Sequence, residues 1–101
     1  MKKENRKLLG RFGVDSGQVL ITDPCYVRDF VNDEMDDKEP NEYSYSNCCE
    51  LSLSKKQGGV LFNSIGCEVG VVATTGYGDG VYSVYATYKE GRIKKLEIIF
   101  F

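Results

Sequence analysis

Residues 74–88 are Thr-Thr-Gly-Tyr-Gly-Asp-Gly followed by Val-Tyr-Ser-Val-Tyr-Ala-Thr-Tyr, and this stretch decides the fold. From Val81 to Tyr88, side chains alternate between two faces, which is typical of a β-strand. The turn at 89–92 follows, with Gly91 at a position that favours the left-handed backbone conformation. The pattern therefore predicts a β-hairpin whose second strand runs from Ile93 to Phe101.

The first half of this stretch predicts a tight loop, because three glycines alternate with Tyr77 and Asp79. Glycine adopts positive φ and lets another backbone or a ligand approach closely. The loop joins the strand expected at Val81–Tyr88 to one expected at Ile65–Thr75. Two interpretations stay open. It is either a bulged turn that Asp79 closes with hydrogen bonds to the backbone, or a surface shaped to receive a ligand.

Composition limits the classes of function. The chain has 101 residues, which predicts one domain, 1–101. Its net charge of -2 shows no basic field for a nucleic-acid polymer. It contains no histidine, which excludes Ser-His and Cys-His catalysis within the chain. No apolar run is long enough to span a membrane, so no membrane partner is expected.

The pattern of the four cysteines indicates the cellular compartment of the protein. It does not predict a metal site, and we expect no cofactor. They fit no zinc-binding spacing, and two of them are adjacent in sequence. The N-terminus is charged and lacks the apolar segment of a signal peptide. We therefore expect reduced, mostly buried thiols and a cytoplasmic protein. The cysteines are Cys25, Cys48, Cys49 and Cys67.

The remaining segments are assigned from local patterns. Residues 1–11 form a basic arm, expected as a solvated terminus, with a helical turn or an anion contact as alternatives. Gln18–Thr22 is β-branched and apolar, which predicts a central strand. Residues 28–45 form an acidic insertion, whose first part is a short helix or an irregular segment. Ser46–Ser54 alternates imperfectly, which predicts a half-buried strand. Val60–Phe62 begins another strand.

Helical periodicity is weak throughout. The fold class predicted from these segments is therefore all-β, a small antiparallel barrel or sandwich of about six to eight strands.

Three carboxylates lie near expected strand ends. Asp15 with Asp23 or Asp79 can hold a cation or accept a hydrogen bond from an exocyclic amine. The same residues can equally be turn residues that bond their own backbone. No spacing among them indicates acid–base catalysis, so we do not expect an enzyme.

Seven tyrosines and no tryptophan favour a binding surface. Bases stack on tyrosine rings, and glycine loops present backbone N–H groups to anions. Tyr77 lies in the loop, whereas Tyr82 and Tyr88 are expected to pack across strands. The candidate ligand-binding residues are Asp15, Ser16, Tyr26, Thr74, Thr75, Gly76, Tyr77, Gly78, Asp79 and Arg92.

Two motifs carry a family resemblance. The first motif is Phe12-Gly13-Val14-Asp15-Ser16-Gly17-Gln18 together with the run to Asp23-Pro24-Cys25-Tyr26. The second motif is residues 75–85. They resemble a large family of small phage and bacterial proteins long known only as a domain of unknown function. That family includes phage sponges that sequester cyclic nucleotide immune signals such as cyclic GMP-AMP and so block CBASS defence. The resemblance implies a non-catalytic binder in the bacterial cytoplasm.

If the protein binds a cyclic nucleotide, as the resemblance implies, positive charge is needed near the phosphates. A homodimer with its pocket near the subunit contact is expected, and the basic arm with Lys89, Arg92, Lys94 and Lys95 would supply positive charge. Two other classes stay open. One is a metal-dependent hydrolase or phosphodiesterase that uses Asp15, Asp23 or Asp79. The other is an inhibitor or immunity-type interaction module whose acidic segment, Asp33 to Glu39, mimics an anionic partner.

Overall fold

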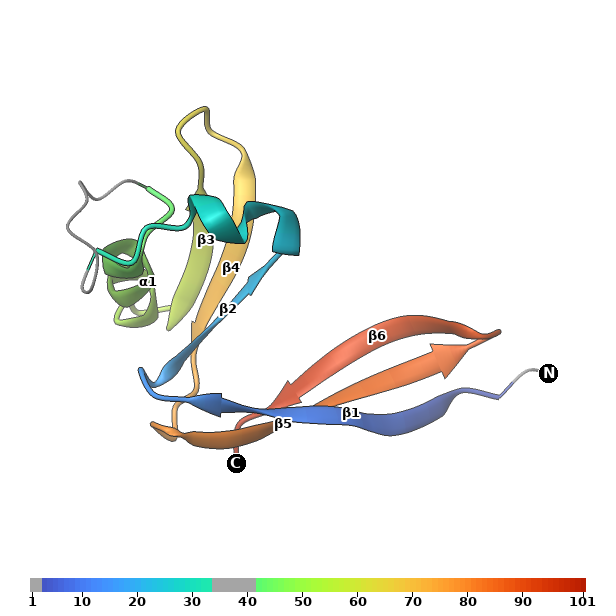
Figure 1. The fold of residues 1–101 in the computed structure, drawn as a ribbon. Helices are drawn as coiled ribbons and strands as arrows, with labels where there is room; N and C mark the ends of the chain where they lie inside the picture. The colour runs from blue at the N-terminus through green and yellow to red at the C-terminus, as the bar shows by residue number, and fades with distance from the viewer. Residues whose placement is uncertain (1–2, 34–41) are drawn as a thin grey trace. The chain divides into compact units, whose positions relative to one another are not determined.

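The computed structural model describes residues 3–33 and 42–101, and within them the chain is mostly β-structure (Figure 1). Its elements in chain order are β1 (Asn5–Val14), β2 (Gln18–Thr22), the 3-10 helix η1 (Pro24–Asp29), α1 (Tyr45–Ser52), β3 (Gly58–Phe62), β4 (Glu68–Thr74), β5 (Gly80–Lys89) and β6 (Arg92–Ile99). These strands form two antiparallel sheets of three strands each. The all-β, antiparallel prediction is confirmed.

The chain divides into two compact units. Unit 1 comprises Met1–Gly17 and Gly76–Phe101, and unit 2 comprises Gln18–Thr75. The acidic insertion predicted at 28–45 belongs to unit 2. Its residues 34–41, with most of the acidic run, lie outside the described residues. No helix in the described ranges is long and apolar enough to cross a membrane.

Unit 1 is built around β5, which pairs with β1 on one side and with β6 on the other (Figure 1). Glu90 and Gly91 connect β5 to β6 with φ of 54° and 76°. Positive φ at both central positions gives a turn whose twist matches that of the flanking strands. The predicted hairpin and the left-handed Gly91 are confirmed.

The expected solvated arm at residues 1–11 is wrong from Asn5 onward, because those residues begin β1. The register against β5 runs from Asn5 opposite Tyr88 to Val14 opposite Gly80. β1 is an edge strand with mostly exposed side chains. Lysine and arginine are common on such edges because they discourage further strand pairing. The charge of the segment therefore concealed a strand.

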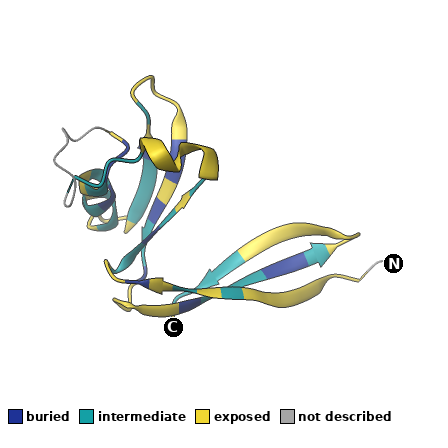
Figure 2. Ribbon diagram, in the orientation of Figure 1, coloured by how far each residue is buried: buried dark blue, intermediate teal, exposed yellow. Residues whose placement is uncertain are grey.

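The sheet of unit 1 is amphipathic. Residues opposite one another in adjacent strands share a face, so the register assigns one face a mostly apolar set, here called the apolar face: Phe12, Tyr82, Val84, Ala86, Tyr88, Ile93, Leu96 and Ile98. Tyr82 and Ala86 are buried on it, but Leu96 is 58% exposed. The exposed stretches of β6 are visible in Figure 2. Unit 1 by itself leaves this face partly uncovered.

Unit 2 packs α1 against the sheet of β2, β4 and β3, in which β4 is central (Figure 1). The strand predicted at Gln18–Thr22 is confirmed to its ends, but it lies at the edge of the sheet and its predicted central position is wrong. The buried cluster that joins helix and sheet consists of Tyr43, Cys48, Leu61, Val69 and Val72.

The half-buried strand predicted at Ser46–Ser54 is wrong, because this segment is α1. The Ser44 side chain caps the helix and accepts a hydrogen bond from Asn47 N. Asp33 accepts hydrogen bonds from both the backbone N and the hydroxyl of Ser46. The bond from the Ser46 hydroxyl is the main reason that the pKa of Asp33 lies below its ordinary value. An eight-residue helix is too short for its period to stand out.

We predict that Gly58→Ala destabilises the protein by about 1–3 kcal/mol, as overpacking does. An added Cβ at Gly58 would lie 2.3 Å from the carbonyl oxygen of Val72, which is backbone and cannot rotate away. The matched control is Gly13→Ala in β1, where no atom lies within 4 Å of an added Cβ. That control should be neutral or slightly stabilising. Urea unfolding of both variants measures the difference, and equal effects would contradict the close approach of β3 to β4.

Candidate functional site

The two sequence motifs meet at one end of unit 1. β1 ends at Val14, which lies opposite Gly80, so Asp15–Gly17 leaves the sheet where the glycine loop enters it. An added Cβ at Gly17 would lie 3.9 Å from the Cα of Gly78 and 4.0 Å from Oδ1 of Asp79. The two turns are therefore neighbours, although about 60 residues separate them in sequence.

The glycine loop has a conformation that only glycine adopts readily. Gly76, Gly78 and Gly80 have φ of 75°, 80° and 157°. Tyr82 donates a hydrogen bond from its hydroxyl to the carbonyl oxygen of Gly78 at 2.6 Å. The ring of Tyr82 is buried and meets the Phe100 ring edge-on at 5.6 Å. The protein's own tyrosine thus occupies the inner side of the bend.

The hydrogen bond from Tyr82 to Gly78 bears on the two interpretations of the loop, a closed turn or a ligand-binding surface. The bend is closed from within, as the turn interpretation requires, and the hydroxyl of Tyr82 is one of the groups that close it. The sequence analysis assigned Tyr82 to cross-strand packing and missed its hydroxyl bond. The signal available was the four-residue spacing from Gly78 to Tyr82 across a sharp turn.

The outer side of the loop carries the groups that a ligand would meet. Tyr77 is 69% exposed, and Asp15, Ser16 and Asp79 are exposed at the same end of unit 1. An exposed phenol ring offers a flat stacking surface, and carboxylates accept hydrogen bonds from amines. This end of unit 1, comprising Asp15–Gly17 and Gly76–Gly80, is the candidate site and is called the loop end.

Other predicted site residues lie elsewhere. Arg92 begins β6 and lies opposite Lys89, at the far end of β5. Ten strand residues span about 30 Å, so one copy of unit 1 does not bring Arg92 to the loop end. Thr74 and Thr75 belong to unit 2, where Thr74 N donates to Gln57 O at 2.8 Å and Thr75 is buried.

Tyr26 lies in a different setting, at the end of β2 in unit 2. Asp23 caps η1 by accepting a hydrogen bond from Cys25 N at 2.8 Å, which fixes the turn that presents Tyr26. Tyr26 lines a cavity of about 310 Å³ with Ile21 and Val71, which lie opposite each other in the sheet. Asp23 is therefore a turn residue, as one of the two interpretations held.

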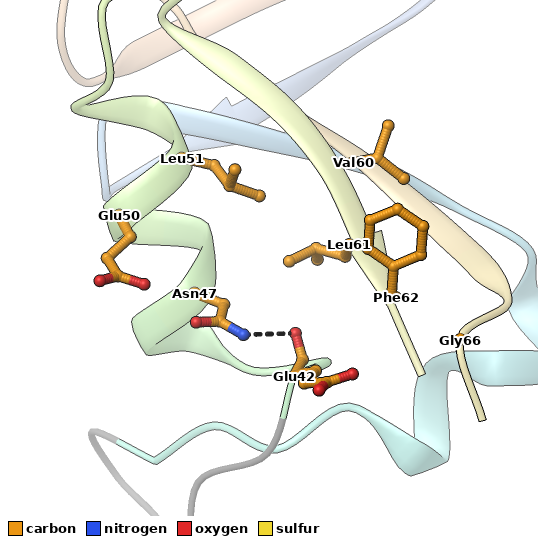
Figure 3. A pocket seen from close by; sticks show the side chains of 8 residues that line it. All are labelled: Glu42, Asn47, Glu50, Leu51, Val60, Leu61, Phe62 and Gly66. Atoms are coloured by element: carbon orange, nitrogen blue, oxygen red, sulfur yellow. Dashed lines mark hydrogen bonds between the residues drawn. The ribbon is translucent and has the colours of Figure 1, made fainter. Parts of the chain in front are cut away.

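A second cavity of unit 2, of about 340 Å³, lies between α1 and β3. Figure 3 shows Leu51 of α1 and Leu61 of β3 on its two sides. At its edge the Asn47 side chain donates to the carbonyl oxygen of Glu42 at 2.7 Å (Figure 3). Sequence reasoning missed this cavity because it placed a strand where α1 lies.

Comparison with known proteins identifies the family. A family model described as a protein of unknown function, DUF4241, matches residues 4–98. The chain belongs to the DUF4241 family. No curated protein and no solved structure matches it significantly.

The described titratable groups of this DUF4241 protein are dispersed, and burial shifts the pKa of one of its thiols. Among residues 3–33 and 42–101, no three histidine, cysteine, aspartate or glutamate side chains gather in a way that could hold a metal ion. All four cysteines are free thiols, but only Cys48 is buried and Cys25 and Cys67 are exposed, so the expectation of mostly buried thiols is wrong. Burial raises the pKa of Cys48 to about 11, so this thiol stays protonated at neutral pH.

We predict that Tyr82→Phe loosens the glycine loop of this DUF4241 protein. The change removes the hydroxyl that holds Gly78 but keeps the buried ring, so we expect a loss of about 0.5–1.5 kcal/mol in unfolding free energy. Hydrogen exchange at the amides of the loop should accelerate. The control is Tyr88→Phe on the same strand, which should change neither measurement. Unaltered exchange in Tyr82→Phe would show that the bond does not hold the loop.

Proposed function

We propose that the protein is a non-catalytic nucleotide-binding protein that sequesters a cyclic dinucleotide of the cyclic GMP-AMP type. The observation that carries the proposal is the exposed ring of Tyr77, held on a glycine loop that Tyr82 fixes from within. An exposed aromatic ring on a constrained loop offers a base a stacking partner that needs little ordering on binding. In this role the protein is a phage sponge acting in the host cytoplasm against CBASS defence, as its motifs suggest.

Polar groups beside Tyr77 support the recognition of a base. Asp79 neighbours the ring in sequence, and Asp15 and Ser16 lie on the adjacent turn. A carboxylate accepts hydrogen bonds from the exocyclic amine of guanine or adenine, and a serine hydroxyl both donates and accepts. No histidine is present to act as a general base at neutral pH. This set of groups suits holding a ligand better than cleaving it.

A second copy of the chain supplies the positive charge that the phosphates need. Among the paired residues of β1, β5 and β6, the apolar face carries one charged residue, Lys7, and its exposed Leu96 and Ile93 favour contact with an identical face. In a two-fold pair with antiparallel strands, the hairpin end of one copy approaches the loop end of the other. Arg92 of the second copy then reaches the phosphates of a ligand bound at the loop end of the first copy. The first copy's own Arg92 lies too far away to do so.

We predict that Tyr77→Ala weakens binding of cyclic GMP-AMP about five- to 150-fold, the loss expected for one base–ring stack of about 1–3 kcal/mol. Tyr77→Phe keeps the ring and should bind nearly as well as the wild type. Isothermal titration calorimetry measures both, and the incubated ligand is then analysed for cleavage. Unchanged affinity in Tyr77→Ala would exclude Tyr77 from the site, and a cleaved product would show that the protein is an enzyme.

We also predict that Leu96→Lys converts a dimer into a monomer and reduces ligand binding with it. Leu96 lies on the apolar face, where a buried lysine would be costly in a dimer but harmless on a free surface. The control is Val81→Lys, which places the same charge on the opposite face at a residue 67% exposed. Sedimentation velocity measures the oligomeric state. A wild-type protein that is monomeric at micromolar concentration would refute the dimer.

A further inference from the structure

Unit 1 gathers basic residues at the end opposite the loop end. The β1–β5–β6 register brings Arg6 of the N-terminal segment and Lys95 of β6 to either side of Thr87. Lys89, two residues further along β5, lies on the same face, which is the face opposite the apolar one. Residues from both ends of the chain thus form one positively charged row.

Thr87 is the unusual member of this row. Its side chain lies in the central strand and is 4% exposed, and its hydroxyl oxygen is buried without a hydrogen-bond partner among the described residues. A buried hydroxyl without a partner is destabilising, and few occur in native proteins. The long side chains of Arg6 and Lys95 flank it directly. Both of these side chains are exposed to solvent.

The carboxylates near the row leave it net positive. Arg6 donates from Nε to Glu97 at 2.9 Å, and its guanidinium lies 3.9 Å from the centre of the Tyr85 ring. The remaining guanidinium nitrogens stay available as donors. Glu4 pairs with Lys94. Within the ranges that the structure describes, the side chains of Lys95 and Lys89 form no hydrogen bond or direct ion pair, although, after the hydrogen bond from Lys94, their charges help to lower the pKa of Glu4.

We propose that Arg6, Thr87 and Lys95 form a phosphate-binding site for a small phosphate ester or pyrophosphate, separate from the loop end. A tetrahedral phosphate accepts one hydrogen bond from the Thr87 hydroxyl and charge-assisted bonds from Arg6 and Lys95. Binding therefore gives the unpartnered hydroxyl an acceptor. Within one copy of the chain, about 24 Å of strand lies between Gly80, where the loop end stops, and Thr87, so the site does not rest on the function proposed for Tyr77.

Pyrophosphate is the probe, since it carries phosphates but no base. We expect it to shift the backbone amide resonances of Thr87 and of the neighbouring residues of β1 and β6 in the full chain, at constant ionic strength. Thr87→Val is the central variant because it keeps the shape and removes the hydroxyl. It should bind pyrophosphate about tenfold or more weakly. Without ligand it should be as stable as the wild type or more stable, because a buried polar group is lost.

Two control variants distinguish a defined phosphate site from nonspecific electrostatic attraction of pyrophosphate to this basic face. Lys95→Ala and Arg11→Ala each remove one positive charge from the same face, but Arg11 lies opposite Ser83, toward the loop end. Lys95→Ala should weaken pyrophosphate binding and Arg11→Ala should not. Tyr77→Ala should bind pyrophosphate like the wild type, whatever it does to cyclic GMP-AMP.

Three results would overturn the site. One is the absence of pyrophosphate-induced shifts at millimolar ligand. Another is equal weakening by Lys95→Ala and Arg11→Ala, which would show a diffuse charge effect. The third is tight binding of a single-stranded oligonucleotide that Thr87→Val leaves unchanged, which would make this face a backbone-tracking surface without a defined phosphate site.

Discussion

The register between β1 and β5 is the constraint on which unit 1 depends. It begins with Asn5 opposite Tyr88 and ends with Val14 opposite Gly80, so it closes the chain's first segment against its last third. One end of this ladder places the Asp15–Gly17 turn beside the glycine loop. The other end places Arg6 beside Thr87. A slip of one residue would move every side chain of β1 to the opposite face and abolish both clusters.

The elements predicted correctly are those whose signal is local. The β5–β6 hairpin follows from strict alternation and a turn with Gly91, and both are visible within about twenty residues. The N-terminal part of β1, up to Arg11, was missed because its partners in β5 lie 72 to 83 residues away in sequence and several of its own side chains are charged. α1 was missed because Cys49, Leu51 and Leu53 mimic a strand, and because one of its N-terminal contacts comes from Asp33.

The candidate site was predictable in its backbone and less so in its side chains. Glycines at alternate positions predicted positive φ, which Gly76 and Gly78 adopt. The hydroxyl bond of Tyr82 depends on how the loop folds back over β5, and the four-residue spacing from Gly78 to Tyr82 is only a weak signal of that folding. Arg92 was grouped with the loop by charge alone. Its place at the opposite end follows from the length of β5, which the sequence analysis had assigned but did not apply to distances.

The net charge of the chain hides local differences in charge between its two units. The net charge of -2 argued against a nucleic-acid polymer as partner, yet the sequence divides into a basic and an acidic part along the two units. Unit 1 carries nine basic and five acidic residues, and unit 2 carries four basic and ten acidic residues. Attraction between exposed charges fades over about 10 Å in 0.1 M salt. A phosphate near Thr87 therefore responds to the row of Arg6, Lys89 and Lys95, and hardly at all to the overall charge.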